Sequence, residues 1–241
     1  MSFKTKAFVL RSRVWREADR LYDLFTPEEG VLNVILKSAA KPGNKLSGHL
    51  LPYSKVSVMI GRGRFDHLAG VETIKDFKNI RTNLKLLSLA GSVVELFIYD
   101  QERGYKYREF NLLESIFSLL DNSDIELDKK SILVRVFLWK YLSLSGWQPQ
   151  LNRCLICNKD ISSGKYVSGR GIICSEHQES GFIVSDNLID FLRFVLDADW
   201  LDFINLKIDK NLNREWLKAS SMFYQSVFER PSQSLKLFNY G

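Results

Sequence analysis

Two pairs of potential metal ligands constrain this chain more than any other feature of its sequence. Cys154 and Cys157 are separated by two residues, and Cys174 and His177 repeat that spacing after sixteen further residues. The pairs contain all the cysteines of the chain and one of its three histidines. Each short turn directs two side chains to one point, and the Gly- and Ser-punctuated loop brings the pairs together. The spacing therefore predicts a tetrahedral zinc site.

The predicted site is structural rather than catalytic. Three thiolates and one imidazole complete a four-coordinate shell, which leaves no open position for water or substrate. We therefore expect one structural Zn²⁺ ion, bound by Cys154, Cys157, Cys174 and His177. The alternative, three unrelated thiols and a surface histidine, requires this spacing to have arisen by chance.

Cysteine usage and hydropathy predict where the protein acts. Cysteines arranged as metal ligands fit a reducing compartment better than a disulfide framework does. The longest uncharged apolar runs, such as residues 86–94, are too short to span a membrane, and the first ten residues lack an export signal. We expect a cytoplasmic protein with no membrane contact.

The net charge of +6 is confined to the first third of the chain. Residues 1–80 contain 14 Lys and Arg against 8 Asp and Glu, whereas the remaining 161 residues contain 20 of each kind. A basic segment beside a neutral one is typical of a protein that binds a polyanion. We therefore expect residues 1–80 to bind nucleic acid.

The basic segment has the pattern of short β-strands. Thr26-Pro-Glu-Glu-Gly30 has proline early and glycine last, as a hairpin connection does. Apolar and alternating runs predict strands at residues 3–14, 21–25, 31–36, 53–60 and 68–74. Five short strands predict a small barrel, for which an OB fold is favoured and an SH3-like barrel remains an alternative.

From about residue 80 the hydrophobic period becomes that of helices. Apolar stripes predict helices at about residues 84–98, 113–120, 133–144, 188–196 and 213–228. Asn83 or Thr82, Asp186 and Asn213 are the expected N-caps. Gly146 should end the third helix, with Pro149 beyond it. The ligand pairs lie between the third and fourth of these helices.

These patterns together predict an α+β protein. A five-stranded OB-fold barrel at residues 1–80 should be followed by a helical bundle domain at residues 81–241. A zinc knuckle at about residues 151–180 is inserted between helices of that bundle. The aromatic stripes of the helices are interpreted as core rather than as a cofactor site.

Short motifs along the chain also resemble those of one known family. They are Lys4-Thr-Lys-Ala-Phe-Val-Leu-Arg11, Glu17-Ala-Asp19, Leu24-Phe-Thr26 with Gly30, Lys45-Leu-Ser-Gly-His-Leu50 with Pro52, Gly61-Arg-Gly63, and the two ligand pairs. In this order and spacing they resemble the bacterial recombination mediator RecO over essentially the full length. His177 stands where many members have a fourth cysteine, an exchange that zinc tolerates.

The resemblance implies a function in DNA repair and homologous recombination without an enzymatic active site. RecO-like proteins bind single- and double-stranded DNA, anneal complementary strands, and act with RecR to load RecA. They also contact the acidic C-terminal tail of single-stranded DNA-binding protein. In the helical region, Arg135, Lys129, Lys130 and Lys140 are cations available to such a tail.

If DNA is the ligand, Lys and Arg of the basic segment should neutralise its phosphates without reading sequence. The candidates are Lys4, Lys6, Arg11, Arg13, Arg16, Lys37, Lys41, Lys45, Arg62 and Arg64. Trp15, Tyr53 and Phe65 are possible stacking platforms, although for Phe65 a place in the barrel core is favoured.

Enzyme classes find little support in the sequence. The chain contains neither Gly-x-x-x-x-Gly-Lys-Ser/Thr nor Gly-x-Ser-x-Gly. A zinc deaminase needs His-x-Glu before its Cys-x-x-Cys, whereas His177-Gln-Glu179 follows it. The alternative that remains is an RNA-binding OB-fold protein with a structural zinc module, because the same basic surface would hold RNA.

Overall fold

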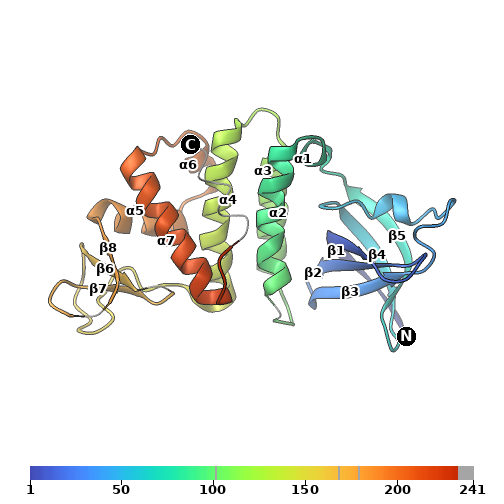
Figure 1. Cartoon of the computed structure of the whole chain (residues 1–241), viewed down its shortest axis with the longest axis horizontal. Coiled ribbons are helices and arrows are strands. Elements are labelled where there is room, and N and C mark those ends of the chain that lie inside the picture. Colours follow the sequence, from blue (N-terminus) through green and yellow to red (C-terminus); the bar gives the residue numbers. More distant parts are fainter. Residues whose placement is uncertain (101, 168, 179, 233–241) are drawn as a thin grey trace. The chain divides into compact units, whose positions relative to one another are not determined.

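The chain forms two compact units, Met1–Asp124 and Ile125–Gly241. A computed structural model describes residues 1–100, 102–167, 169–178 and 180–232 (Figure 1). Among the helices of these residues, none combines the length and apolar character that a bilayer span requires.

The first unit opens with a closed five-stranded barrel. Its strands are β1 (Ser2–Val14), β2 (Arg20–Thr26), β3 (Gly30–Leu36), β4 (Lys55–Gly61) and β5 (His67–Lys75), with a short 3-10 helix η1 (Ser47–His49) between β3 and β4. They are ordered β1-β2-β3-β5-β4, and β4 pairs with β1. The single parallel pairing joins β3 to β5 at Ile35 and His67. This order is that of an OB-like barrel and confirms the favoured prediction over the SH3-like alternative.

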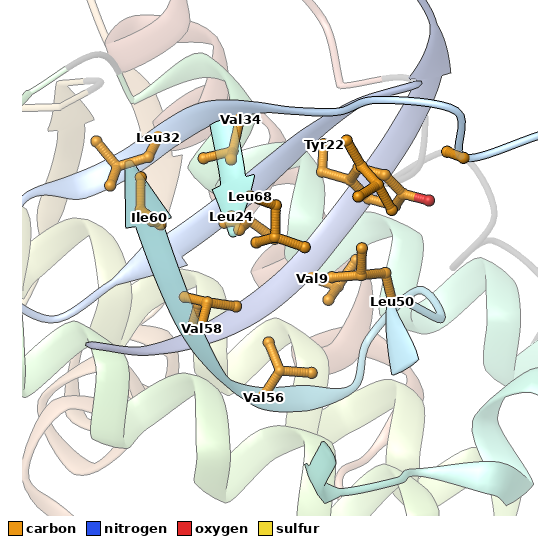
Figure 2. Close-up of a cluster of buried hydrophobic side chains, with 13 residues drawn as sticks. Val9, Tyr22, Leu24, Leu32, Val34, Leu50, Val56, Val58, Ile60 and Leu68 are labelled. Carbon is orange, nitrogen blue, oxygen red and sulfur yellow. The ribbon is translucent and has the colours of Figure 1, made fainter. Parts of the chain in front are cut away.

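The barrel core is filled by side chains that alternate along the strands. Ala7 and Val9 of β1 point inward and are fully buried. Figure 2 shows apolar side chains from all five strands, together with Leu50, converging in the barrel. The predicted hairpin between β2 and β3 is confirmed, since Thr26 pairs with Gly30. Gly30 has a φ of 72°, which glycine adopts without strain.

Helices pack on the outside of the same barrel. They are α1 (Lys78–Thr82), α2 (Leu84–Tyr99) and α3 (Tyr107–Asp121). Phe8 points out of the barrel and its ring centroid lies 4.8 Å from that of Phe110 and 5.7 Å from that of Phe117. The predicted boundary after residue 80 therefore falls within a compact unit.

The second unit combines helices with a small sheet. Its elements are α4 (Leu127–Leu142), the π-helical turn η2 (Ser143–Trp147), β6 (Gly164–Val167), β7 (Gly171–Ile173), β8 (Phe182–Val184), α5 (Asp186–Asp197), α6 (Trp200–Ile204) and α7 (Lys210–Phe228). Helix α4 lies at the centre of the core, where the buried Trp139 indole donates to the Ser220 hydroxyl of α7 at 2.8 Å. The strands are ordered β7-β6-β8 and lie between η2 and α5 in the chain.

The helix ends differ in part from the predicted ones. Asn83 caps α2, as predicted, by accepting from two backbone amides. Helix α5 is capped by Ser185 rather than Asp186, because Ser185 has extended backbone and accepts from the amide of Leu188. Helix α7 begins one turn before Asn213, capped by Asp209. The short helices α1 and α6 were not predicted, since five residues give little more than one turn of periodicity.

The aromatic contact between the barrel and its helices should carry much of the stability of the first unit. Replacing the fully buried Phe8 with alanine removes the ring that α3 packs against. We expect Phe8→Ala to lower the free energy of unfolding by about 3–5 kcal/mol, measured by urea denaturation. The control Phe65→Ala alters a ring that is 52% exposed and should cost far less. Equal losses in the two variants would contradict the packing described.

Candidate functional site

Three loops meet at one end of the barrel. The β1–β2 loop contacts the connection that follows β3, because Ala40 donates to the carbonyl of Ala18 at 3.0 Å and the Ser38 amide donates to Asp19 Oδ1 at 2.8 Å. Asn44 folds that connection back by donating to the carbonyls of residues 37 and 38. The β4–β5 turn joins through the edge-to-face contact of Trp15 and Phe65, with ring centroids 5.8 Å apart.

These loops form one basic surface with aromatic side chains in it. We call it the loop surface, and it consists of Trp15, Arg16, Lys37, Lys41, Lys45, Arg64 and Phe65. Its five cations are all exposed. None of them has an acidic partner within the described part of the chain. The acidic residues in the same loops are fewer, and Asp66 among them is paired with Arg62. The surface therefore carries a positive excess.

The two rings of the loop surface are accessible. Trp15 is 40% exposed and Phe65 is 52% exposed. The favoured core position for Phe65 was therefore wrong, because this residue lies in the turn after β4 and not on a strand. Arg64 lies over the Phe65 ring at 5.7 Å from its centroid. Tyr53 is less exposed and packs edge-to-face with Phe117 instead, with the ring centroids 5.7 Å apart.

Of the other five predicted cations, four lie on β1, and Arg62 lies in the β4–β5 turn but is ion-paired. Arg11 and Arg13 both bind the buried carboxylate of Asp23, at 2.5 and 2.8 Å. Arg62 is paired with Glu29 and Asp66. Lys4 and Lys6 are exposed on β1, opposite residues 59 and 57 of β4.

Asp23 and Arg103 lie next to Arg11 and Arg13, and the sequence analysis predicted a role for neither of them. Asp23 is 2% exposed and is held by Arg11, Arg13 and the Asn33 amide, which lies 2.7 Å away. Arg103, from the connection between α2 and α3, lines a polar pocket of about 420 Å³ with them. Asp23 could have been noticed as a single acidic residue within an otherwise apolar predicted strand. No sequence pattern pointed to Arg103.

The second unit brings the four predicted metal ligands together. The ligand atoms of Cys154, Cys157, Cys174 and His177 all lie within 4.8 Å of one another. Cys157 Sγ and Cys174 Sγ are 3.9 Å apart. The four side chains are thus grouped closely enough to hold one metal ion.

Backbone constraints explain why this sequence forms the group. Asn158 takes a left-handed conformation with φ of 57°, and its amide closes a turn by donating to the Cys154 carbonyl at 3.0 Å. Gly171 opens β7 at φ of 142°, where an added Cβ would lie 2.3 Å from the Gln150 carbonyl oxygen. Strand β7 then ends directly before Cys174. The second ligand pair is therefore positioned by the sheet.

The protonation of the thiols is set by burial and by backbone donors. The amides of Ile156 and Cys174 point at Cys154 Sγ, at 3.5 and 3.4 Å. Burial raises the pKa of Cys154, but the backbone N–H donors outweigh it and lower that pKa to about 6. The pKa of Cys174 is raised, first by burial and also by the neighbouring thiols.

The histidine of the group supports the same interpretation. His177 Nε2 is buried and has no hydrogen-bond partner in the described ranges. A buried ring nitrogen without a partner is costly unless it binds something. Its position beside three sulfur atoms fits the ligand set of a closed zinc site.

The metal-ligand loop is fixed to the helices by one arginine. Arg193 of α5 donates to the Leu151 carbonyl at 3.1 and 2.7 Å and to the Ile161 carbonyl at 2.9 Å. These two carbonyls flank the first ligand pair in the chain. Movement of the loop relative to α5 would therefore break these hydrogen bonds.

The four cations expected to be available to an acidic tail are not free surface groups. Arg135 is 3% exposed, donates to Asn213 at 2.6 Å and lies over the Trp216 ring, and burial lowers its pKa to about 10. Lys130 is 4% exposed. Lys129 donates to the carbonyl of residue 206, and Lys140 donates to those of residues 196 and 198. Arg135 and Lys130 are therefore not available to a tail, whereas the half-buried Lys129 and Lys140 are engaged by backbone carbonyls.

Comparison with known proteins places the chain in one family. The family model for the Recombination protein O N terminal matches residues 1–77, and the model for the Recombination protein O C terminal matches residues 81–236. A protein of Dehalococcoides mccartyi named DNA repair protein RecO is 32% identical over 240 residues, which cover 97% of this chain and 93% of the relative.

Two further relatives carry the same name. The protein of Alkaliphilus metalliredigens is 28% identical over 237 residues, covering 95% of each chain. That of Clostridium novyi is 26% identical over 243 residues, covering 99% of this chain and 94% of the relative. Both family models match the chain in order, and the relatives are similar to it over nearly their full length. The chain therefore belongs to the RecO family.

Proposed function

We propose that this chain is a DNA repair and recombination mediator that binds single- and double-stranded DNA through the loop surface. The observation that carries the proposal is the grouping of five exposed cations around two accessible rings at the end of an OB-like barrel. Loops at this end of OB folds bind oligonucleotides in other proteins. Family membership favours DNA over RNA as the ligand.

The contacts available on the loop surface suit a strand of any sequence. Lysine and arginine neutralise phosphates and release counterions, which gives affinity without base readout. Trp15 and Phe65 offer ring faces or edges on which a base of any identity stacks. Arg64 lies close to Phe65, so a phosphate and its base can be bound together there.

We propose further that the protein anneals complementary strands without nucleotide hydrolysis and is not an enzyme. A strand held by its backbone keeps its bases free to pair. Neutralising the phosphates lowers the repulsion between two strands, so that pairing itself supplies the free energy. With RecR, the protein would then help to load RecA onto DNA coated by single-stranded DNA-binding protein, as the family resemblance implies.

Recruitment to coated DNA is proposed to use the acidic tail of the coating protein. The coat occupies the phosphates, so charge on the loop surface alone gains little there. A tail contact elsewhere on the chain would raise the effective concentration of the loop surface at the DNA. Because Arg135 and Lys130 are buried, we propose that more exposed residues form this contact.

We also propose that the metal group holds one structural zinc ion, as expected of a protein of the reducing cytoplasm. The three thiolates and the His177 imidazole supply four ligands, so zinc would fix the turn of the first pair to the end of β7. Binding free energy at such a site contributes directly to folding.

Purified protein should contain one zinc ion per chain. Cys157→Ser removes one of four ligands and should abolish stoichiometric zinc and lower the stability of the second unit. Metal analysis and thermal unfolding measure the two effects. Ser162→Ala, an exposed change in the same loop, is the control and should retain zinc. Protein free of zinc after growth in zinc-supplemented medium would remove the metal from this proposal.

Charge reversal on the loop surface should weaken DNA binding of every sequence alike. Lys41→Glu with Lys45→Glu removes two phosphate contacts. The slope of log affinity against log salt should then fall by about 1.4, since each contact with a single strand contributes about 0.7. Fluorescence anisotropy with labelled oligonucleotides over a salt series measures it.

A matched double variant controls for net charge. Lys78→Glu with Lys85→Glu makes the same charge change at two exposed helix starts, where acids are favourable. It should keep the wild-type salt slope apart from a small general shift. If both double variants behave alike, the loop surface is not the binding site. Competition with RNA of the same sequence tests the RNA-binding alternative, which predicts that RNA displaces DNA.

Annealing should proceed without ATP and should depend on the tail when the strands are coated. Three substrates are compared: bare strands, strands coated with intact single-stranded DNA-binding protein, and strands coated with its tail-deleted form. We expect annealing on the first two and little on the third, measured by fluorescence quenching as strands pair. Equal rates on the two coated substrates would eliminate tail recruitment, and an ATP requirement on bare strands would overturn the annealing proposal.

A further inference from the structure

Helix α7 presents a row of cations to solvent. Lys210, Arg214 and Lys218 follow one another at four-residue spacing, and all three are exposed. The opposite face of the helix is buried through Trp216, Phe223 and other residues. We call Lys210, Arg214 and Lys218 the α7 stripe. Although residues 81–241 contain equal numbers of acidic and basic side chains, they thus include a local positive surface.

The α7 stripe is not explained by ion pairing. None of its three cations has an acidic partner within the described residues. The acids of the same segment serve other groups: Asp209 caps the helix, and Glu215 accepts from the Ser185 hydroxyl at 2.8 Å. No acidic residue lies in the first turn of α7.

The position of the stripe also opposes helix stability. The N-terminal end of a helix carries a partial positive charge, so cations there are unfavourable. Lys210 is the first residue of α7 and Arg214 lies one turn later. The charge of Lys210 therefore adds to that of the helix N-terminus, and Arg214 and Lys218 extend the positive surface along the helix.

The geometry of the stripe fits an extended polyanion. Residues four apart in a helix are about 6 Å apart along the axis, similar to neighbouring phosphates of an extended strand. The Lys218 ammonium is held over the Phe182 ring of β8, 3.9 Å from its centroid. Strand β8 thus holds the last cation of the stripe in place.

We infer that the α7 stripe is a second binding site for single-stranded DNA, separate from the loop surface. The inference rests on the proposed DNA-binding function and extends it. Annealing requires two strands on the protein at once, and one loop surface per chain accounts for one of them. The α7 stripe supplies backbone contacts for the second strand.

The number of oligonucleotides bound per chain tests this inference. Full-length protein is mixed with an excess of a thymidine oligonucleotide of about eight residues, within the range of OB-fold site sizes, and measured by native mass spectrometry. The stripe variant is Lys210→Ala with Arg214→Ala. Its control is Lys78→Ala with Lys85→Ala, which removes two exposed cations from the starts of two other helices. The loop variant is Lys41→Glu with Lys45→Glu.

We expect two oligonucleotides per chain for the wild type and the control, and one for the stripe variant. The stripe variant should also lose annealing of bare strands while keeping its unfolding temperature, since the substitutions remove cations that oppose the helix dipole. One oligonucleotide on the wild type, or two on the stripe variant, overturns the second site. The loop variant separates the two proposals: if it still binds two oligonucleotides, the loop surface has failed, whatever the stripe variant does.

Discussion

Strand β1 has to satisfy two apolar environments at once. Its two-residue period sends Ala7 and Val9 into the barrel and Phe8 outward to the aromatic rings of α3. The barrel and its helices are therefore parts of one compact unit, built on opposite faces of a single strand. That arrangement covers one side of the barrel and leaves its loops free at one end. The loop surface depends on this division, because the apolar packing holds the strands from which the loops extend.

Sequence patterns predicted the elements that local chemistry determines. The turn between β2 and β3, the cap at Asn83 and each of the two ligand pairs follow from a few neighbouring residues. The pairing of β3 with β5 and the small sheet β7-β6-β8 involve residues distant in the chain or strands of three or four residues. Short strands leave too little periodicity to recognise.

The roles of individual charged residues were harder to predict from the sequence than the fold. Counting cations located the basic segment, yet it could not distinguish Arg11 and Arg13, which neutralise the buried Asp23, from Lys41 and Lys45, which have exposed positions. The same limit applied to residues 81–241, where equal numbers of acids and bases suggested a neutral surface. Ion pairs form between residues that the fold brings together, and a sequence count does not contain that information.

The separation of the ligand pairs in the chain has a consequence for biosynthesis. The first unit ends at Asp124, whereas the metal group is complete only when His177 has been added. At about 5–20 residues per second, the ribosome takes roughly 3–10 s to make the 53 residues between these points. During that interval the barrel and helices α1–α3 have their whole sequence, while Cys154 and Cys157 are synthesised before the second ligand pair. The nascent chain thus contains half of the metal group for a time, and binding of the proposed zinc ion is possible only after that.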